Sequence, residues 1–271
     1  MIAQFAIRLI CGMSLVWWLA PRKQITDGFF RIQMLIVLGL AVLAALLGFE
    51  PLRETGETSP SEADVLLGSV TDTWLCTATP VVAFFGSITW ALGRRRLGTS
   101  CSAAVTGLAL VLLIGPAWPP SPISSAHLLL VITSELATAL LLGAAMVSML
   151  LGHWYLTATG MSLAPLWRLN TVFGIATLLR IVLATTGLWL VDKLPGTDYH
   201  VTLLALRWLV GLLGPLVVVG MVWRILKYRN TQAATGVLYT GVLLTVTSAG
   251  RGLFKTNQSS RAEVMSLINR G

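Results

Sequence analysis

The stretch SSAHLLLVITSELATALLLGAAMVSMLL, residues 124–151, decides the fold class of this protein. It is apolar almost throughout, and Glu135 is its only residue that is charged at neutral pH. At a rise of about 1.5 Å per residue, an α-helix of this length crosses the hydrocarbon core of a bilayer, which is about 30 Å thick. Runs of this kind recur along almost the whole chain, which predicts an all-α polytopic integral membrane protein.

The composition agrees with this fold class. Of the 271 residues, 55% are hydrophobic and 11% are charged, against about 25% charged in average soluble domains. The net charge of +8 does not indicate a nucleic-acid-binding protein, because most Lys and Arg residues lie at the ends of apolar runs. The three cysteines form no CxxC pair and fall in or beside apolar runs, so neither a disulfide framework nor a zinc site is expected.

We predict eight membrane spans and an orientation with the N-terminus outside. The spans cover residues 3–19, 28–49, 65–92, 101–118, 124–151, 165–191, 200–226 and 232–250. With their flanks, the inner loops then carry Arg22, Lys23, Arg31, Arg94, Arg95, Arg96, Arg168, Arg224, Lys227 and Arg229, while the outer loops hold most of the acidic residues. This asymmetry follows the positive-inside rule. Compact loops, with no N-x-[ST] sequon in the outer ones, favour a cell (inner) membrane. The basic tail, residues 251–271, disagrees, because eight spans place it outside.

Short sequence similarities suggest an internal duplication. Residues 17–19 (WWL) and 30–33 (FRIQ) recur as 154–156 (WYL) and 167–170 (WRLN), both at an offset of about 137. Pro80 and Pro215 differ by a similar offset. We therefore expect two tandem four-helix bundles, residues 1–123 and 124–250, followed by the tail. The alternative is chance similarity, because apolar segments are built from few residue types.

Ionisable residues within the spans are candidate sites, because a charge in the hydrocarbon is costly without a partner. They are Asp72, Glu135, Arg180 and Arg207. Asp72 and Arg207 differ by the same offset as the prolines, so we expect a structural ion pair between the bundles, and Arg180 also needs a partner. Arg8 lies near the end of its span and is expected to snorkel to the surface.

Two histidines open spans at the predicted outer face. His127 precedes Glu135 by eight residues, and His200 precedes Arg207 by seven. Two facing imidazoles can ligate haem b, with Arg207 near a propionate. The same groups fit a quinone head-group pocket in which His and Glu accept protons. The alternative is that both histidines are interfacial residues without a ligand.

No nucleotide-binding, zinc-protease or serine-hydrolase motif is present, so we expect no enzyme acting on its own. The predicted function is a multi-pass membrane subunit of a respiratory or other redox complex, embedded in the lipid bilayer beside other membrane or peripheral subunits. It would bind quinone or haem b near the outer leaflet through His127, His200, Glu135 and Arg207. The alternatives are a small-solute or ion-coupled transporter and a ligand-free scaffold or assembly protein.

Overall fold

The computed structural model describes residues 2–48, 62–115, 125–158, 160–189 and 208–246, and in these ranges it contains helices and no strand. The helices are α1 (Ile2–Leu19), η1 (Arg22–Gln24), α2 (Asp27–Gly48), α3 (Glu62–Ala91), α4 (Arg95–Ile114), α5 (Ser125–Thr157), α6 (Ala164–Trp189), η4 (Leu209–Leu213), α8 (Gly214–Lys227) and a final helix, Thr231–Val246.

Seven apolar helices in the described ranges are long enough to cross a membrane, when η4 and α8 are counted together as Leu209–Lys227. This confirms the predicted class, an all-helical membrane protein. The final helix, Thr231–Val246, is apolar but shorter than the other seven. Its 16 residues extend about 24 Å, less than the usual thickness of the hydrocarbon core.

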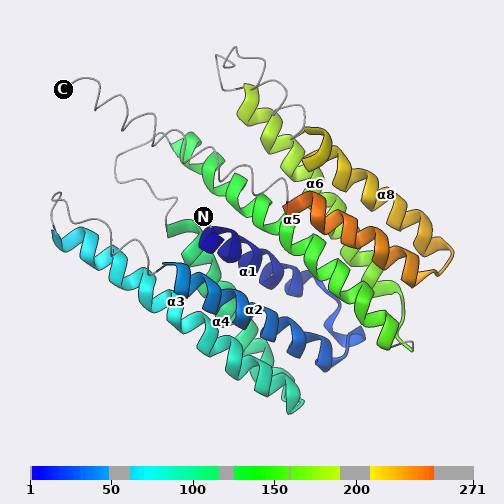
Figure 1. Ribbon diagram of the computed structural model, residues 1–271, viewed down its shortest axis with the longest axis horizontal. Helices are drawn as coiled ribbons and strands as arrows, with labels where there is room; N and C mark the ends of the chain where they lie inside the picture. The colour runs from blue at the N-terminus through cyan, green and yellow to red at the C-terminus, as the bar shows by residue number, and fades with distance from the viewer. Residues whose placement is uncertain (1, 49–61, 116–124, 159, 190–207, 247–271) are drawn as a thin grey trace.

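Helices α1 and α5 lie at the centre of the structure (Figure 1). Helix α1 packs against α2, α4 and α5, and α3 packs against α2 and α4. On the other side, α6 packs against α5 and α8. The final helix contacts α5, because Thr235 lies against Gly152, and it contacts α6 and α8, because Gly241 lies against Phe173 and Val218.

The contact between α1 and α5 is a crossing of two backbones at glycine. A Cβ added to Gly12 would lie 1.7 Å from the carbonyl oxygen of Ala139, and one added to Gly143 would lie 2.0 Å from the carbonyl carbon of Gly12. Small residues allow helices in a bilayer to approach this closely and to gain van der Waals contact. The side chain of any other residue would therefore separate the two helices.

The start of α2 and the ends of several other helices meet at one end of the structure. Arg95 at the start of α4 forms an ion pair with Asp27 at the start of α2, with 2.9 Å between Nε and Oδ1. The indole N–H of Trp154 near the end of α5 donates to the hydroxyl of Thr26 at 2.9 Å. We call this the basic end, because its exposed cations are Lys23, Arg31, Arg94, Arg95, Arg96, Arg168, Arg224, Lys227 and Arg229.

Helix α1 ends before it reaches the basic end. The indole N–H of Trp18 donates to the Thr106 hydroxyl at 3.1 Å, and Thr106 lies about 16 Å along α4 from its first residue. The chain then continues towards α2 as a partly buried segment in which Ala20 and Ile25 are buried. Part of the connection between α1 and α2 therefore packs inside the protein.

Arg22 stabilises the C-terminal end of α1. Its Nε donates to the carbonyl oxygen of Trp17 at 3.3 Å, and its guanidinium lies 4.1 Å from the centroid of the Trp18 ring. Burial lowers the pKa of this guanidinium, which lies between the spans. A cation at this position is favourable, because the last carbonyl groups of a helix lack partners within the helix.

A π turn precedes α8. Within η4 the N–H of Gly214 donates to the carbonyl of Leu209, five residues earlier, and Pro215 follows directly. Proline has no N–H to continue the normal hydrogen-bond ladder and its ring crowds the preceding turn, so a wider turn at this position has a clear cause.

Candidate functional site

A charged pair joins the two central helices close to their glycine crossing. Arg8 of α1 donates from Nε to Oε2 of Glu135 at 2.7 Å and from Nη2 to Oε1 at 2.8 Å. The side chains are 13% and 28% exposed, respectively. A bidentate pair of this kind fixes both side chains in one geometry. Arg8 therefore binds Glu135, while its expected snorkelling to the membrane surface stays a prediction.

A second arginine approaches the same part of α5 from the other side. Arg180 of α6 donates from Nη1 to the hydroxyl of Ser134 at 3.1 Å, next to Glu135 in the chain. We call Arg8, Ser134, Glu135 and Arg180 the Glu135 cluster. It lies where α1, α5 and α6 meet, since α5 contacts both of the other helices.

The Glu135 cluster lies far from the basic end. Glu135 precedes Trp154 by 19 residues, which is about 28 Å along α5, and Arg180 lies about 24 Å from the start of α6. A hydrocarbon core is about 30 Å thick. If the tryptophans of the basic end mark one interface, the cluster lies near the opposite border of the core, where polar head groups and water begin.

The structure describes only part of the predicted site. Glu135 and Arg180 belong to the Glu135 cluster. His127 lies at the start of α5 and Asp72 lies within α3, but their side chains are outside the described part, and His200 and Arg207 lie outside it entirely. The proposed Asp72–Arg207 ion pair and the ligation by His127 and His200 therefore stay predictions.

Sequence reasoning missed the partner of Glu135, although a helical pattern could have indicated it. Arg8 and Gly12 are four residues apart on α1, and Glu135, Ala139 and Gly143 follow at the same spacing on α5. Residues at this spacing share one face of a helix. In each helix the charge therefore lies one turn from the small residues that allow close packing.

Two buried amides end the similar stretches 30–33 (FRIQ) and 167–170 (WRLN). Gln33 and Asn170 are both fully buried. Nδ2 of Asn170 donates to the carbonyl of Val219 at 3.2 Å, whereas neither amide atom of Gln33 has a hydrogen-bond partner within the described ranges. Buried amides without partners are rare, so these residues mark polar positions inside both groups of helices.

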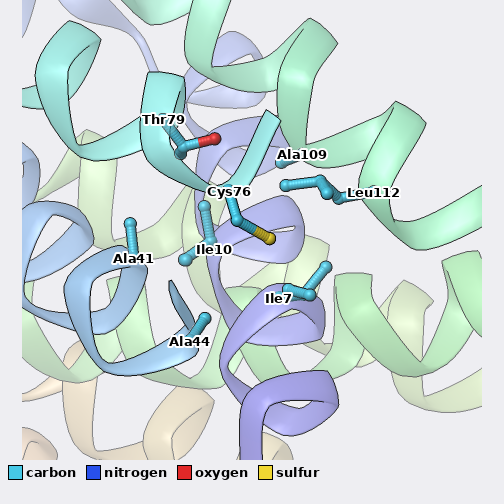
Figure 2. A pocket seen from close by; sticks show the side chains of 8 residues that line it. All are labelled: Ile7, Ile10, Ala41, Ala44, Cys76, Thr79, Ala109 and Leu112. Atoms are coloured by element: carbon cyan, nitrogen blue, oxygen red, sulfur yellow. The ribbon is translucent and has the colours of Figure 1, made fainter. Parts of the chain in front are cut away.

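A small cavity lies among the first four helices (Figure 2). Its lining residues are Ile7, Ile10, Ala41, Ala44, Cys76, Thr79, Ala109 and Leu112. The lining is mostly apolar, and the space accommodates about one water molecule. This cavity therefore fits neither a quinone ring nor a haem.

Among the side chains that the structure describes, no three His, Cys, Asp or Glu residues are grouped so that they could hold a metal ion. Comparisons with family models, curated proteins and solved structures found no match to this chain. The functional interpretation therefore depends on the geometry of the Glu135 cluster.

Proposed function

We propose that this protein is a multi-pass membrane subunit of a respiratory or other redox complex and binds quinol at the Glu135 cluster. The observation that carries the proposal is a partly exposed carboxylate, Glu135, bound by Arg8 near the border of the hydrocarbon core, with Arg180 on the neighbouring Ser134. An ionisable group in a membrane span is costly, and such groups commonly serve ligand binding or proton transfer.

The chemistry of the cluster suits a quinol head group. Arg8 occupies one lone pair on each oxygen of Glu135, and a carboxylate oxygen has a second lone pair that can accept a hydrogen bond from a quinol hydroxyl. Oxidation of a quinol to a quinone releases both hydroxyl protons and both electrons. In this proposal Glu135 accepts one proton and a histidine of the pocket, His127 or His200, accepts the other, and both electrons pass to a redox centre in a partner subunit. His127, His200 and Arg207 complete the pocket or, alternatively, ligate haem b.

Matching contacts support an internal duplication with eight spans. Phe30 of α2 stacks on Trp90 of α3, and Trp167 of α6 packs against Trp223 of α8. Thr106 of α4 accepts a hydrogen bond from α1, while Thr235 of the final helix lies against α5. These paired contacts are what a duplication of residues 1–123 as 124–250 would produce. The basic end supports an inner-membrane orientation with that end inside and the N-terminus outside.

A second candidate function is a ligand-free scaffold or assembly protein. It is favoured by the same ion pair, because both oxygens of Glu135 already accept hydrogen bonds from Arg8 across the central crossing. In that case the charges only hold α1 and α5 together. The two functions differ in whether the purified protein contains a quinone or haem.

The proposal is tested on full-length protein purified in mild detergent. We expect co-purified quinone in an organic extract of the wild type. The double variant Arg8→Met/Glu135→Met removes both charges without leaving either one unpaired. We expect its quinone content to be lower than that of the wild type by a factor of about ten or more. A reduced-minus-oxidised absorption spectrum of the same samples tests for haem b, whose band should disappear in both His127→Ala and His200→Ala.

The matched control is His153→Ala. His153 is exposed near the basic end, so its removal should change neither quinone content nor the spectrum. Folding of each variant is checked by its elution volume and helical circular dichroism. Wild-type protein with neither quinone nor a haem band would contradict the redox proposal and favour the scaffold. Equal quinone in the double variant would exclude the Glu135 cluster as the site.

A further inference from the structure

An aromatic pair at the basic end is open to the surroundings. The rings of Trp167 in α6 and Trp223 in α8 lie 6.0 Å apart, centroid to centroid, and Trp223 is 54% exposed. An aromatic pair in the first four helices is closed, since Phe30 and Trp90 are 2% and 4% exposed and Gly98 of α4 lies directly against Trp90. The two aromatic pairs therefore differ in how far they are exposed.

Three cations lie near the open pair in the chain. Lys227 lies one turn after Trp223, with its Nζ 6.0 Å from the centroid of that ring. Arg168 and Arg224 directly follow the two tryptophans in the chain, and all three cations are exposed. We call Trp167, Arg168, Trp223, Arg224 and Lys227 the Trp223 patch.

The charge of the Trp223 patch is not balanced within the described part of the chain. None of its three cations forms an ion pair with a described side chain, and the one acidic side chain described at the basic end, Asp27, binds Arg95. Indole rings prefer the head-group level of a bilayer, and basic groups between spans at the inner side bind anionic head groups. The position, the aromatic rings and the charge thus all favour a lipid phosphate.

We propose that the Trp223 patch is a binding site for an anionic phospholipid. The headgroup phosphate accepts hydrogen bonds from Arg168, Arg224 and Lys227, while the acyl chains lie along the exposed apolar faces of α6 and α8. Those faces include Leu178, Val182, Val217 and Met221. The site does not depend on the redox function, because it lies at the opposite end of the spans from the Glu135 cluster.

The test is native mass spectrometry of the full-length protein titrated with phosphatidylglycerol or phosphatidylcholine in detergent. We expect the wild type to bind phosphatidylglycerol more tightly than phosphatidylcholine. The triple variant Arg168→Gln/Arg224→Gln/Lys227→Gln should bind it at least about ten-fold more weakly. Trp223→Leu keeps all charges but removes the indole, so it should bind phosphatidylglycerol a few-fold more weakly than the wild type.

The matched control is Arg31→Gln/Arg94→Gln/Arg96→Gln. It removes three positive charges from the same basic end, but beside the closed pair Phe30–Trp90. It should retain wild-type binding within about two-fold. An equal loss of lipid binding in both triple variants would overturn the proposal in favour of a nonspecific charge effect. Unchanged lipid binding in the triple variant of the Trp223 patch would also overturn it. Inorganic phosphate at millimolar concentration should not displace the lipid, and displacement would identify a site for free phosphate instead.

Discussion

Arg8 and Glu135 meet across 127 residues of sequence, and their environment differs from that of the other described ion pair. In the Arg95–Asp27 pair the arginine side chain is 56% exposed, whereas Arg8 is 13% exposed. Exposed pairs contribute about 0–1 kcal/mol, because water screens the attraction. Removing one partner of a buried pair costs more, since the remaining charge has no partner.

We expect Glu135→Gln to lower the free energy of unfolding by about 1–3 kcal/mol, less than the roughly 3–5 kcal/mol typical of fully buried pairs, because Glu135 is partly exposed. The double variant Arg8→Met/Glu135→Met should recover most of that loss. Thermal unfolding in detergent, arranged as a double-mutant cycle, measures both effects.

Arg95→Gln/Asp27→Asn is the control cycle and should show a coupling energy below about 1 kcal/mol. A Glu135→Gln variant as stable as the wild type would mean that the pair does not hold α1 against α5.

At the residue scale the sequence identified Glu135 and Arg180 as unusual, since charges within apolar runs are visible without a structure. It did not identify Arg8 as the partner of Glu135. That pairing depends on which helices are neighbours, and hydropathy carries no information about neighbours.

At the scale of helices the sequence was most informative about length. The predicted span 3–19 corresponds to α1, Ile2–Leu19, and the predicted span 28–49 corresponds to α2, Asp27–Gly48. The thickness of a bilayer sets the length of an apolar run, so these boundaries are readable. The π turn before Pro215 was not predicted, because local backbone contacts determine it.

The glycine crossing gives a prediction for the pair α1 and α5. Gly12→Ala or Gly143→Ala places a methyl group against backbone atoms that cannot rotate away. We expect each variant to lose about 1–3 kcal/mol of stability, as overpacked sites do. Thermal unfolding in detergent measures the change.

Gly39→Ala is the matched control, since no atom lies within 4 Å of its added Cβ. It should leave the stability unchanged or slightly raise it, because alanine favours helix over glycine. Equal effects at Gly39 and Gly143 would show that helix propensity, and not the crossing, explains the result.

At the scale of the whole molecule, the sequence predicted the membrane class, whereas the number of spans and the side of the tail depend on the short final helix. Thr231–Val246 is about 6 Å shorter than a hydrocarbon core of 30 Å. Local thinning of the bilayer can accommodate a short span at a modest cost.

We expect this helix to cross the membrane and place the tail outside. Alkaline phosphatase fused after residue 250 should then be active, since the enzyme folds only outside the inner membrane. A fusion at Met161, in the connection between α5 and α6, should be inactive. Activity of the Met161 fusion would reverse the orientation, and an inactive tail fusion would mean that the final helix does not cross.

The central crossing also has a consequence for how the protein is made. A ribosome adds about 5–20 residues per second, so about 6–25 s separate the synthesis of Arg8 from that of Glu135. During that interval α1 is in or at the membrane with its cation unpaired and the face that carries Gly12 uncovered. The insertion machinery or α2 and α4 must therefore shelter α1 until α5 is synthesised, and assembly of the two halves is completed late in translation.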